Sequence, residues 1–279
     1  MENPLEQILI TGASGMVGNY IDFGTSLDHR ALDVTNSEEV GRAIEYYKPR
    51  VIVHLAAETD VDRCEREPEH AFFVNGVGTW NMALAAKKSG ARLIYVSTVY
   101  VFDGLKHSPY EETDVPSPLN FYGQSKYMGE MLIQELLRDY SILRSGWMFG
   151  GGPERDRKFV GKIMRQLDQA EIKAVDNILG SLTYAKDLAA KIKTVAVMEH
   201  PPRIMHVGNE GFCSRYDVAV EIAKAAEKII KITPVDSSYF KLDASRSHSD
   251  RMISACGGTL RPWRGALQDY IHNEWTKKH

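Results

Sequence analysis

The first half of the chain alternates short apolar runs with longer segments of helical periodicity. The apolar runs cover residues 7–12, 50–57, 92–98 and 140–146. Between them, the segments 36–48, 69–90 and 119–137 place apolar side chains at helical spacing, and the segment 69–90 ends at a glycine typical of a helix C-terminus. Strands that are apolar throughout and separated by helices predict a doubly wound α/β fold, in which helices cover both faces of a parallel sheet.

After residue 147 the alternation becomes less regular. The glycines at 150–152 and Pro153 predict a flexible break, after which a helix is expected near 185–198, a strand over 203–208 and a helix over 214–229. The polar tail closes with RPWRGALQDYI (261–271) and a terminal KKH expected to be disordered. We expect one domain over 1–147 and a smaller lobe, mainly over 148–279, some of whose elements return to the core of the first domain.

Composition narrows the class of protein. The chain has 279 residues, 43% hydrophobic and 25% charged, with a net charge of −3, and lacks the basic excess expected of a protein that binds nucleic acid or an anionic membrane. Its cysteines lie far apart and form neither a zinc motif nor a disulfide framework, which favours a reducing cytoplasm. The N-terminus is not expected to be a signal peptide, and no apolar stretch approaches the ~20 residues that span a bilayer.

The acidic segment 58–69 has no metal-ligand spacing, so we predict no metal site there.

A glycine-rich loop follows the first predicted strand. In TGASGMVG (11–18), Gly12, Gly15 and Gly18 fall at G-x-x-G-x-x-G. Glycine lets the backbone turn sharply and approach a pyrophosphate, while N–H groups at the start of the next helix face the phosphates. A tight turn without a ligand would use the same glycines, but their place after the first strand favours a dinucleotide site in a Rossmann-type domain.

The segment after this loop is short. Only twelve residues (19–30) separate Gly18 from ALDVTN (31–36). A complete crossover unit needs about 30 residues, so we expect either a short first helix or a vestigial second strand. The residue after the second strand usually distinguishes NAD from NADP, and the sequence does not identify it. Arg30 would suit a 2′-phosphate, but it would suit a solvated surface position at least as well.

A tyrosine and a lysine lie four residues apart in NFYGQSKYMGE (120–130). Tyr122 and Lys126 would share one face of the predicted helix, and of the thirteen tyrosines only Tyr122 has a lysine at this spacing. An adjacent ammonium favours the phenolate, as acid-base catalysis near neutral pH requires. Thr98 ends a predicted strand, where an open α/β sheet places its ligand crevice, and its hydroxyl could hold a substrate oxygen. A surface pair on a helix and a strand-end hydroxyl bonded to the backbone are the structural alternatives.

In chain order, the glycine loop, HLAA (54–57), VNGVGTWN (74–81), VSTVYVFDG (96–104), SPLNFYGQSKYMGE (117–130) and LRSGWMFGGG (143–152) resemble the extended short-chain dehydrogenase/reductases. The pattern is most similar to the dTDP-4-dehydrorhamnose reductase family. This resemblance implies an oxidoreductase of dTDP-rhamnose biosynthesis, with a Rossmann domain for NADP or NAD and a C-terminal lobe for a nucleotide-sugar. Such an enzyme would reduce a 4-keto sugar by hydride transfer. A homodimer formed through the helices near 70–88 and 120–137 is also implied.

The same resemblance assigns roles to individual residues. It implies that Tyr122 is the proton donor, that Lys126 bonds the nicotinamide ribose and lowers the pKa of Tyr122, and that Thr98 completes the catalytic set. The residues expected to bind the cofactor are Gly12, Ala13, Ser14, Gly15, Met16, Val17, Asp33, Val34, Ala56 and Ala57, together with Tyr122 and Lys126. The residues expected to approach the sugar are Thr59, Val61, Tyr100 and Trp147, together with Thr98.

Four departures from the family pattern fall at or near the expected substrate side. Val99 replaces an aspartate, Arg215 replaces a tryptophan, Leu182 with Thr183 replaces Pro-Thr, and Ser245–Ser247 replaces Ser-Arg-Pro. They leave the identity of the sugar open. Two other functions also remain open: an epimerase or dehydratase with tightly bound NAD, and a regulatory subunit similar to the one that partners a methionine adenosyltransferase.

Overall fold

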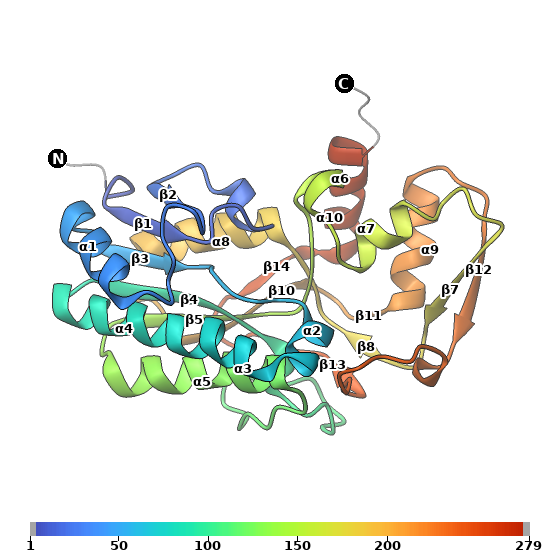
Figure 1. Ribbon diagram of the computed structural model, residues 1–279. Helices are drawn as coiled ribbons and strands as arrows, with labels where there is room; N and C mark the ends of the chain where they lie inside the picture. The colour runs from blue at the N-terminus through green and yellow to red at the C-terminus, as the bar shows by residue number, and fades with distance from the viewer. Residues whose placement is uncertain (1–3, 276–279) are drawn as a thin grey trace.

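The computed structural model describes residues 4–275, and its centre is a seven-stranded sheet (Figure 1). The strand order is β14-β10-β5-β4-β3-β1-β2, and all pairs are parallel. The strands are β1 (Ile8–Thr11), β2 (Thr25–Leu27), β3 (Val51–His54), β4 (Arg92–Thr98), β5 (Tyr140–Ser145), β10 (Ile204–Glu210) and β14 (Thr259–Pro262). The predicted doubly wound α/β fold is therefore confirmed.

Helices cover both faces of this sheet because neighbouring strand residues point to opposite sides. Leu9 packs with the helices α1 (Ser37–Tyr47), α4 (Gly78–Ser89) and α5 (Phe121–Leu136), whereas Ile8 and Ile10 pack with α8 (Ala185–Val197) on the other face. Figure 1 shows α4 and α5 side by side in front of the sheet and α8 behind it. The segment predicted as one helix over 69–90 consists of α3 (Pro68–Ala71), a π-helical turn (Phe72–Val77) and α4, which ends at Gly90.

The first crossover is reduced at both of its elements. The helix expected after the glycine loop is a single 3-10 turn, Gly18–Tyr20, and β2 has three residues. We expected one of the two to be short, and both are. The prediction that the loop opens a helix is wrong, because the twelve intervening residues are too few to form a helix and return to the sheet.

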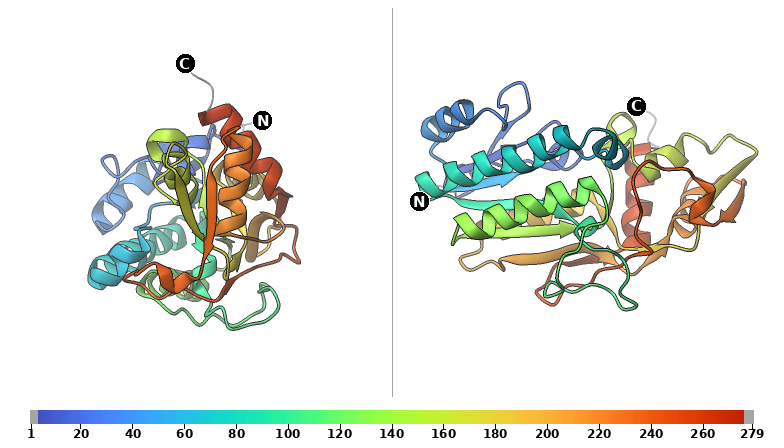
Figure 2. Two further views of the ribbon diagram at one scale, coloured as in Figure 1. Left: turned by 90° about the vertical axis from the view of Figure 1, so that its right-hand side faces the viewer. Right: turned by 60° about the horizontal axis from the view of Figure 1, so that its bottom comes forward.

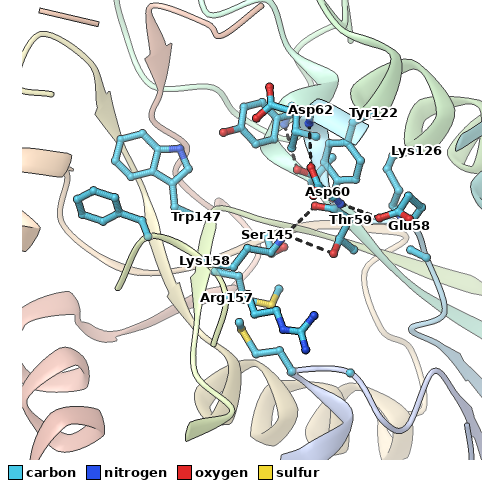
Figure 3. A pocket seen from close by; sticks show the side chains of 18 of the residues that line it. Glu58, Thr59, Asp60, Asp62, Tyr122, Lys126, Ser145, Trp147, Arg157 and Lys158 are labelled. Atoms are coloured by element: carbon cyan, nitrogen blue, oxygen red, sulfur yellow. Dashed lines mark hydrogen bonds between the residues drawn. The ribbon is translucent and has the colours of Figure 1, made fainter. Parts of the chain in front are cut away.

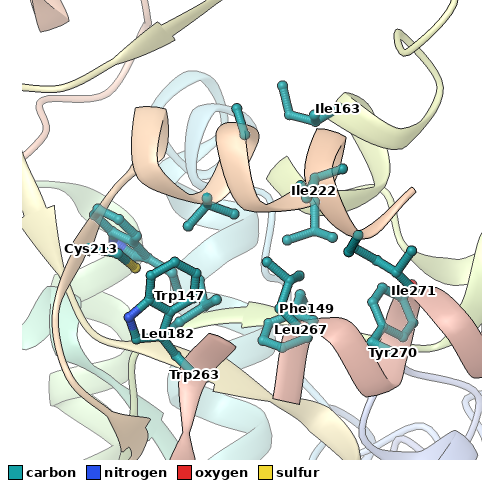
Figure 4. Close-up of a cluster of buried hydrophobic side chains, with 14 of the residues drawn as sticks. Trp147, Phe149, Ile163, Leu182, Cys213, Ile222, Trp263, Leu267, Tyr270 and Ile271 are labelled. Atoms are coloured by element: carbon teal, nitrogen blue, oxygen red, sulfur yellow. The ribbon is translucent and has the colours of Figure 1, made fainter. Parts of the chain in front are cut away.

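The C-terminal half contributes to both parts of the molecule. The elements α8, β10 and β14 belong to the sheet and its cover, whereas the other elements form a lobe at one end of the sheet (Figure 2). The lobe packs around a separate apolar core (Figure 4). That core is formed mainly by Trp147 and Phe149, Ile222, and the α10 (Trp263–Tyr270) residues Trp263 and Leu267. The other helices of the lobe are α6 (Gly152–Arg155), α7 (Phe159–Met164) and α9 (Arg215–Ala225). Its strands form three small sheets: β6 (Trp147–Phe149) pairs with β9 (Leu182–Tyr184), and β7 (Glu171–Val175) pairs with β12 (Lys231–Val235). In the third sheet, β8 (Leu179–Gly180) lies between β11 (Cys213–Ser214) and β13 (Ser249–Asp250).

One carboxylate joins the start of the chain to the end of the described region. Glu274 accepts hydrogen bonds from the hydroxyls of Tyr20, at 2.7 Å, and Tyr184, at 2.6 Å. The Tyr20 oxygen in turn accepts from the backbone N–H of Gly151. These bonds link the first crossover to the segment that leads into the lobe. The terminal KKH, predicted to be disordered, lies outside the described residues.

Candidate active site

A cavity of about 1280 Å³ lies between the carboxyl ends of the central strands and the lobe. Its walls come from the segments that directly follow β1, β3, β4 and β5, from the N-terminal half of α5, and from α7, α9 and residues 237–250. Figure 3 shows Tyr122 and Lys126 on one side of this space, facing Trp147, Arg157 and Lys158 on the other. This is the position at which open α/β sheets bind their ligands.

The glycine loop forms one end of the cavity, and its backbone is closely packed. Gly12 has φ +71°, and a Cβ there would lie 2.6 Å from the backbone nitrogen of Ala56. A Cβ on Gly18 would collide with the carbonyl of Ala13. The structure therefore requires glycine at both positions, and leaves a backbone surface that a dinucleotide phosphate can approach without side chains in between. The residues present fit a dinucleotide in this respect.

The residues assigned to the cofactor line this end of the cavity, with one exception. Gly12, Ser14, Gly15, Met16, Val17, Asp33, Val34, Ala56 and Ala57 are in its wall. The exception is Ala13, whose N–H donates to the carbonyl of Leu27. His29, Leu32 and Thr35 join the wall, but Arg30 is exposed and does not.

Tyr122, Lys126 and Thr98 meet in the same cavity. Tyr122 and Lys126 lie one turn apart on α5, whose N-terminus is capped by the Asn120 side chain, and both are almost fully buried. The Lys126 ammonium lies 4.1 Å from the ring centroid of Tyr95. Thr98 accepts a hydrogen bond from the N–H of Tyr100, and its hydroxyl is close enough to lower the pKa of Tyr122. The surface-pair alternative for Tyr122 and Lys126 is thereby excluded.

Burial dominates the electrostatics of this group. It raises the pKa of Tyr122 well above its usual value, and the Thr98 hydroxyl offsets only part of this effect. Burial also lowers the pKa of Lys126 to about 7. The expected net lowering of the Tyr122 pKa is thus not found in this structure, and the phenol is neutral at physiological pH. His54, at the end of β3, hydrogen-bonds Thr11 and Thr79, and burial lowers its pKa to about 3.

A residue that the sequence analysis missed positions one wall of the site. Asn75 lies in the π-helical turn and is fully buried. Its amide exchanges hydrogen bonds with both backbone groups of Glu58 and donates to Ser125 Oγ at 2.9 Å. The π turn therefore aims this side chain at the loop after β3 and at α5. The signal available in the sequence was an asparagine between apolar residues within a predicted helix.

The residues assigned to the sugar besides Thr98 also line the cavity, near α7, α9 and residues 237–250. Trp147 donates from Nε1 to Asp250 at 2.7 Å, and Tyr100 packs edge-on against Tyr122 at 6.0 Å between ring centroids. Thr59 and Val61 lie in the loop after β3 and at the start of α2 (Val61–Arg66). Lys158 also lines the cavity, and its ammonium donates to the Thr59 carbonyl at 2.6 Å (Figure 3).

Two of the four departures face the cavity and two do not. The Arg215 guanidinium stacks 3.8 Å over the ring centroid of Trp147, and Arg246 also lines the wall while it donates to Asp62. Val99 instead packs in a small apolar cluster, so the expectation that it changes the substrate side is wrong. Leu182 and Thr183 are buried in the interior.

Basic side chains on this side of the cavity were also missed. Arg157, Lys158, Lys162 and Lys173 line it together with Arg215 and Arg246. The acidic segment 58–69 contributes Asp60 as the N-cap of α2 and Asp62 as the partner of Arg246. Among residues 4–275, no group of three His, Cys, Asp or Glu side chains is arranged to hold a metal ion. No helix in that range has both the length and the apolar character needed to cross a bilayer.

Comparisons with known proteins identify the family of this chain. Residues 6–275 match the family model described as the RmlD substrate binding domain. The chain is 32% identical to the spore coat polysaccharide biosynthesis protein SpsK of Bacillus subtilis, covering 96% of this chain and 97% of that protein. It is 34% identical to the dTDP-4-dehydrorhamnose reductase of Mycobacterium tuberculosis, covering 94% and 91% respectively.

Solved structures give the same result. The dTDP-4-dehydrorhamnose reductase of Bacillus anthracis, solved in complex with NADP, superposes with a TM-score of 0.89 at 32% identity, covering 95% of this chain and 98% of that one. A UDP-glucose 4-epimerase of Thermus thermophilus shares the fold, with a TM-score of 0.81 at 21% identity and coverage of 97% and 99%. Because the family model spans nearly the whole chain, the protein belongs to the dTDP-4-dehydrorhamnose reductase family of extended short-chain dehydrogenase/reductases.

Proposed function

We propose that this protein is an NAD(P)H-dependent reductase that converts the keto group of a nucleotide-activated sugar to an alcohol. A dTDP-4-keto-6-deoxy sugar, the substrate class named for its relatives, is the first candidate. The observation that carries the proposal is that Tyr122, Lys126 and Thr98 line the same cavity as the glycine loop. A dinucleotide held at that loop would supply the hydride.

The acid-base residues suit the reductive direction. Reduction of a ketone requires a group that donates a proton to the developing alkoxide, and a neutral phenol can do so. Because burial raises the pKa of Tyr122, its proton is retained at neutral pH until the oxygen becomes basic. Thr98 would orient that oxygen beside the phenol, and Lys126 would bond the ribose of the dinucleotide. Gly12, Gly15 and their neighbours would hold its pyrophosphate.

The other side of the cavity suits the nucleotide-sugar. A diphosphate carries negative charge, and the basic side chains there, including Arg157, Lys162 and Arg215, offer complementary charge. Tyr100 lines the same wall beside Tyr122, and the Trp147 ring there is covered by the Arg215 guanidinium, so Arg215 is the group that a sugar would meet. Arg215 replaces the family's tryptophan within this wall, so we expect the sugar preference to be set there.

Oligomerisation stays a prediction. The helix pair expected to form a homodimer carries exposed apolar side chains, among them Phe73, Trp80 and Met131. Exposed apolar residues on two adjacent helices are typical of an interface between protein chains.

Substitution of Tyr122 by phenylalanine tests the proposal. Loss of the phenol should lower kcat for NADPH oxidation with a dTDP-4-keto-6-deoxy sugar by about 10²–10⁴-fold, with little change in melting temperature because the ring is retained. Tyr127→Phe, on the same helix outside the cavity, is the matched control. Unchanged turnover in Tyr122→Phe would show that the proton comes from elsewhere. Bound NAD with no net cofactor consumption would instead identify an epimerase or dehydratase, and a stable hetero-oligomer without activity would identify a regulatory subunit.

A further inference from the structure

A buried carboxylate lies behind the acid-base residues, outside the cavity wall. Glu130 is on α5, one turn after Lys126, and is fully buried. It accepts a hydrogen bond from Ser97 Oγ at 2.5 Å, and from Arg144 at 3.0 Å through Nε and 2.7 Å through Nη2. Arg144 is itself only 2% exposed. A charged pair this deeply buried needs an explanation, because desolvation opposes it.

Three elements of the active site meet at this carboxylate. Ser97 directly precedes Thr98 on β4, and Arg144 lies on β5. The two strands are also joined by a hydrogen bond from Ser145 Oγ to the carbonyl of Ser97 at 3.1 Å. Glu130 therefore connects the helix that carries Tyr122 and Lys126 to the strand end that carries Thr98. A change at this carboxylate would alter the position of the helix relative to Thr98.

Stability alone does not account for the pair. A buried ion pair is often no more stabilising than apolar side chains of similar volume, and the advantage depends on every polar atom finding a partner. Here the Nη1 atom of Arg144 is buried without a hydrogen-bond partner among residues 4–275. The Glu130–Arg144 pair is therefore not expected to stabilise the fold more than apolar side chains would, which points to a role for its charges other than packing.

The charge of Glu130 acts on Lys126. Burial lowers the pKa of the Lys126 ammonium to about 7, and the Glu130 carboxylate is the main influence that raises it. The titratable groups that face Lys126 come from α5, β4, β3 and α2, namely Glu130, Tyr122, Tyr95, His54 and Cys64. Burial keeps both phenols and the thiol protonated and His54 neutral at neutral pH. Glu130 is the only carboxylate among these five groups, and it is paired with Arg144.

We propose that Glu130 is a positioning residue of the reductase site. Its carboxylate, fixed by Arg144 and Ser97, holds Tyr122 and Lys126 in register with Thr98 and places a negative charge one helical turn from the Lys126 ammonium. This inference rests on the proposed function, because the Lys126 ammonium matters for catalysis only if the protein is a reductase. The titration of Lys126 can nevertheless be measured whether or not the protein turns over a sugar.

The experiment compares three variants by two independent readouts. Glu130→Gln removes the charge, and Glu130→Leu combined with Arg144→Met replaces the whole pair by apolar side chains without leaving a buried charge. Glu135→Gln, exposed on the same helix, is the matched control. The first readout is the titration of Lys126 by NMR of protein labelled at the lysine ε-carbon, with the resonance assigned through Lys126→Arg. The second is the pH profile of kcat.

We expect both Glu130 variants to titrate Lys126 at least about one pH unit lower than the parent protein. The alkaline limb of kcat should move down with it, and kcat at pH 8 should fall about tenfold or more. The control should match the parent in both readouts. The double variant should have a melting temperature equal to or above that of the parent protein, while its activity stays low. It therefore distinguishes positioning from packing even where Glu130→Gln fails to fold.

Two results would overturn the inference. The first is a Lys126 titration in the double variant that matches that of the parent protein. The second is a double variant with the full activity of the parent protein, which would show that the Glu130–Arg144 pair contributes only packing. Absence of reductase activity in the parent protein would instead refute the proposed function, and the Lys126 titration would still report on Glu130. The two failures are therefore distinguishable.

Discussion

Replacing Gly12 by alanine tests whether the close backbone packing of the glycine loop makes the dinucleotide site. Alanine at φ +71° costs about 1–2 kcal/mol, and its Cβ would lie 2.6 Å from the nitrogen and 2.8 Å from the Cα of Ala56. Both are backbone atoms, so the loop after β3 has to move, which adds about 1–3 kcal/mol of overpacking. The total of about 2–5 kcal/mol corresponds to a melting temperature roughly 5–15 °C lower.

Gly41 provides a control with the opposite sign. It lies within the exposed part of α1, where a Cβ would meet no atom within 4 Å. Gly41→Ala should therefore stabilise the protein by about 1 kcal/mol through helix propensity, which raises the melting temperature by about 2–4 °C. One chemical change at two glycines thus has opposite predicted effects.

The assay is thermal unfolding of both variants with and without NADPH. At a concentration 100 times Kd, a ligand that binds only the folded protein stabilises it by about 2.7 kcal/mol. Gly12→Ala should lose most of this stabilisation, and Gly41→Ala should keep it. If Gly12→Ala melted within 2 °C of the parent and gave the same NADPH-induced shift, close backbone approach would not be what forms the site.

Two further predictions concern other groups. Arg215→Trp should raise KM for the nucleotide-sugar by about 10–100-fold, the effect of losing a charged hydrogen bond, and Arg215→Lys should recover part of it; an unchanged KM would place the substrate elsewhere. Burial alone would raise the pKa of Glu112, but hydrogen bonds from Ser254, His206 N–H, Ala255 N–H and Cys256 outweigh it and lower that pKa to about 2. Since the pKa is depressed in the folded state, this stabilisation is present above about pH 4.5 and is lost as the pH falls toward 2. Urea unfolding of Glu112→Gln should show a shallower dependence on pH in that window, and an identical dependence would contradict the assignment.

The sheet could be predicted because its signals are local. The strands β1 and β3 are short apolar runs, and the expected strands at 92–98 and 140–146 agree with β4 and β5 to within a residue, whereas β2 and β14 were not located from the sequence. The pairing of Tyr122 with Lys126 could also be predicted from the sequence, because the two residues lie one turn apart on a single helix. Their i, i+4 spacing places both side chains on one face of a helix and requires no tertiary contact.

The missed parts of the site depend on partners distant in sequence. Arg246 and Asp62 are 184 residues apart, and Lys158 reaches Thr59 over 99 residues. No periodicity relates such positions. Val99 was misinterpreted for a related reason: the polypeptide makes a 3-10 turn directly after β4, and this turn directs the side chain away from the cavity and into an apolar cluster.

The reduced first crossover changes what must hold a dinucleotide. In a complete crossover, a helix of several turns directs its N-terminal dipole at the pyrophosphate, but the dipole of the three-residue turn Gly18–Tyr20 is necessarily small. The remaining contributions are the close approach that Gly12 and Gly15 permit and the charges that line the rest of the cavity. Affinity should therefore depend more on the exact backbone path of this loop than it does where a long helix contributes. For that reason a single methyl group at Gly12 is a more demanding test of this protein than a change in any side chain of the loop.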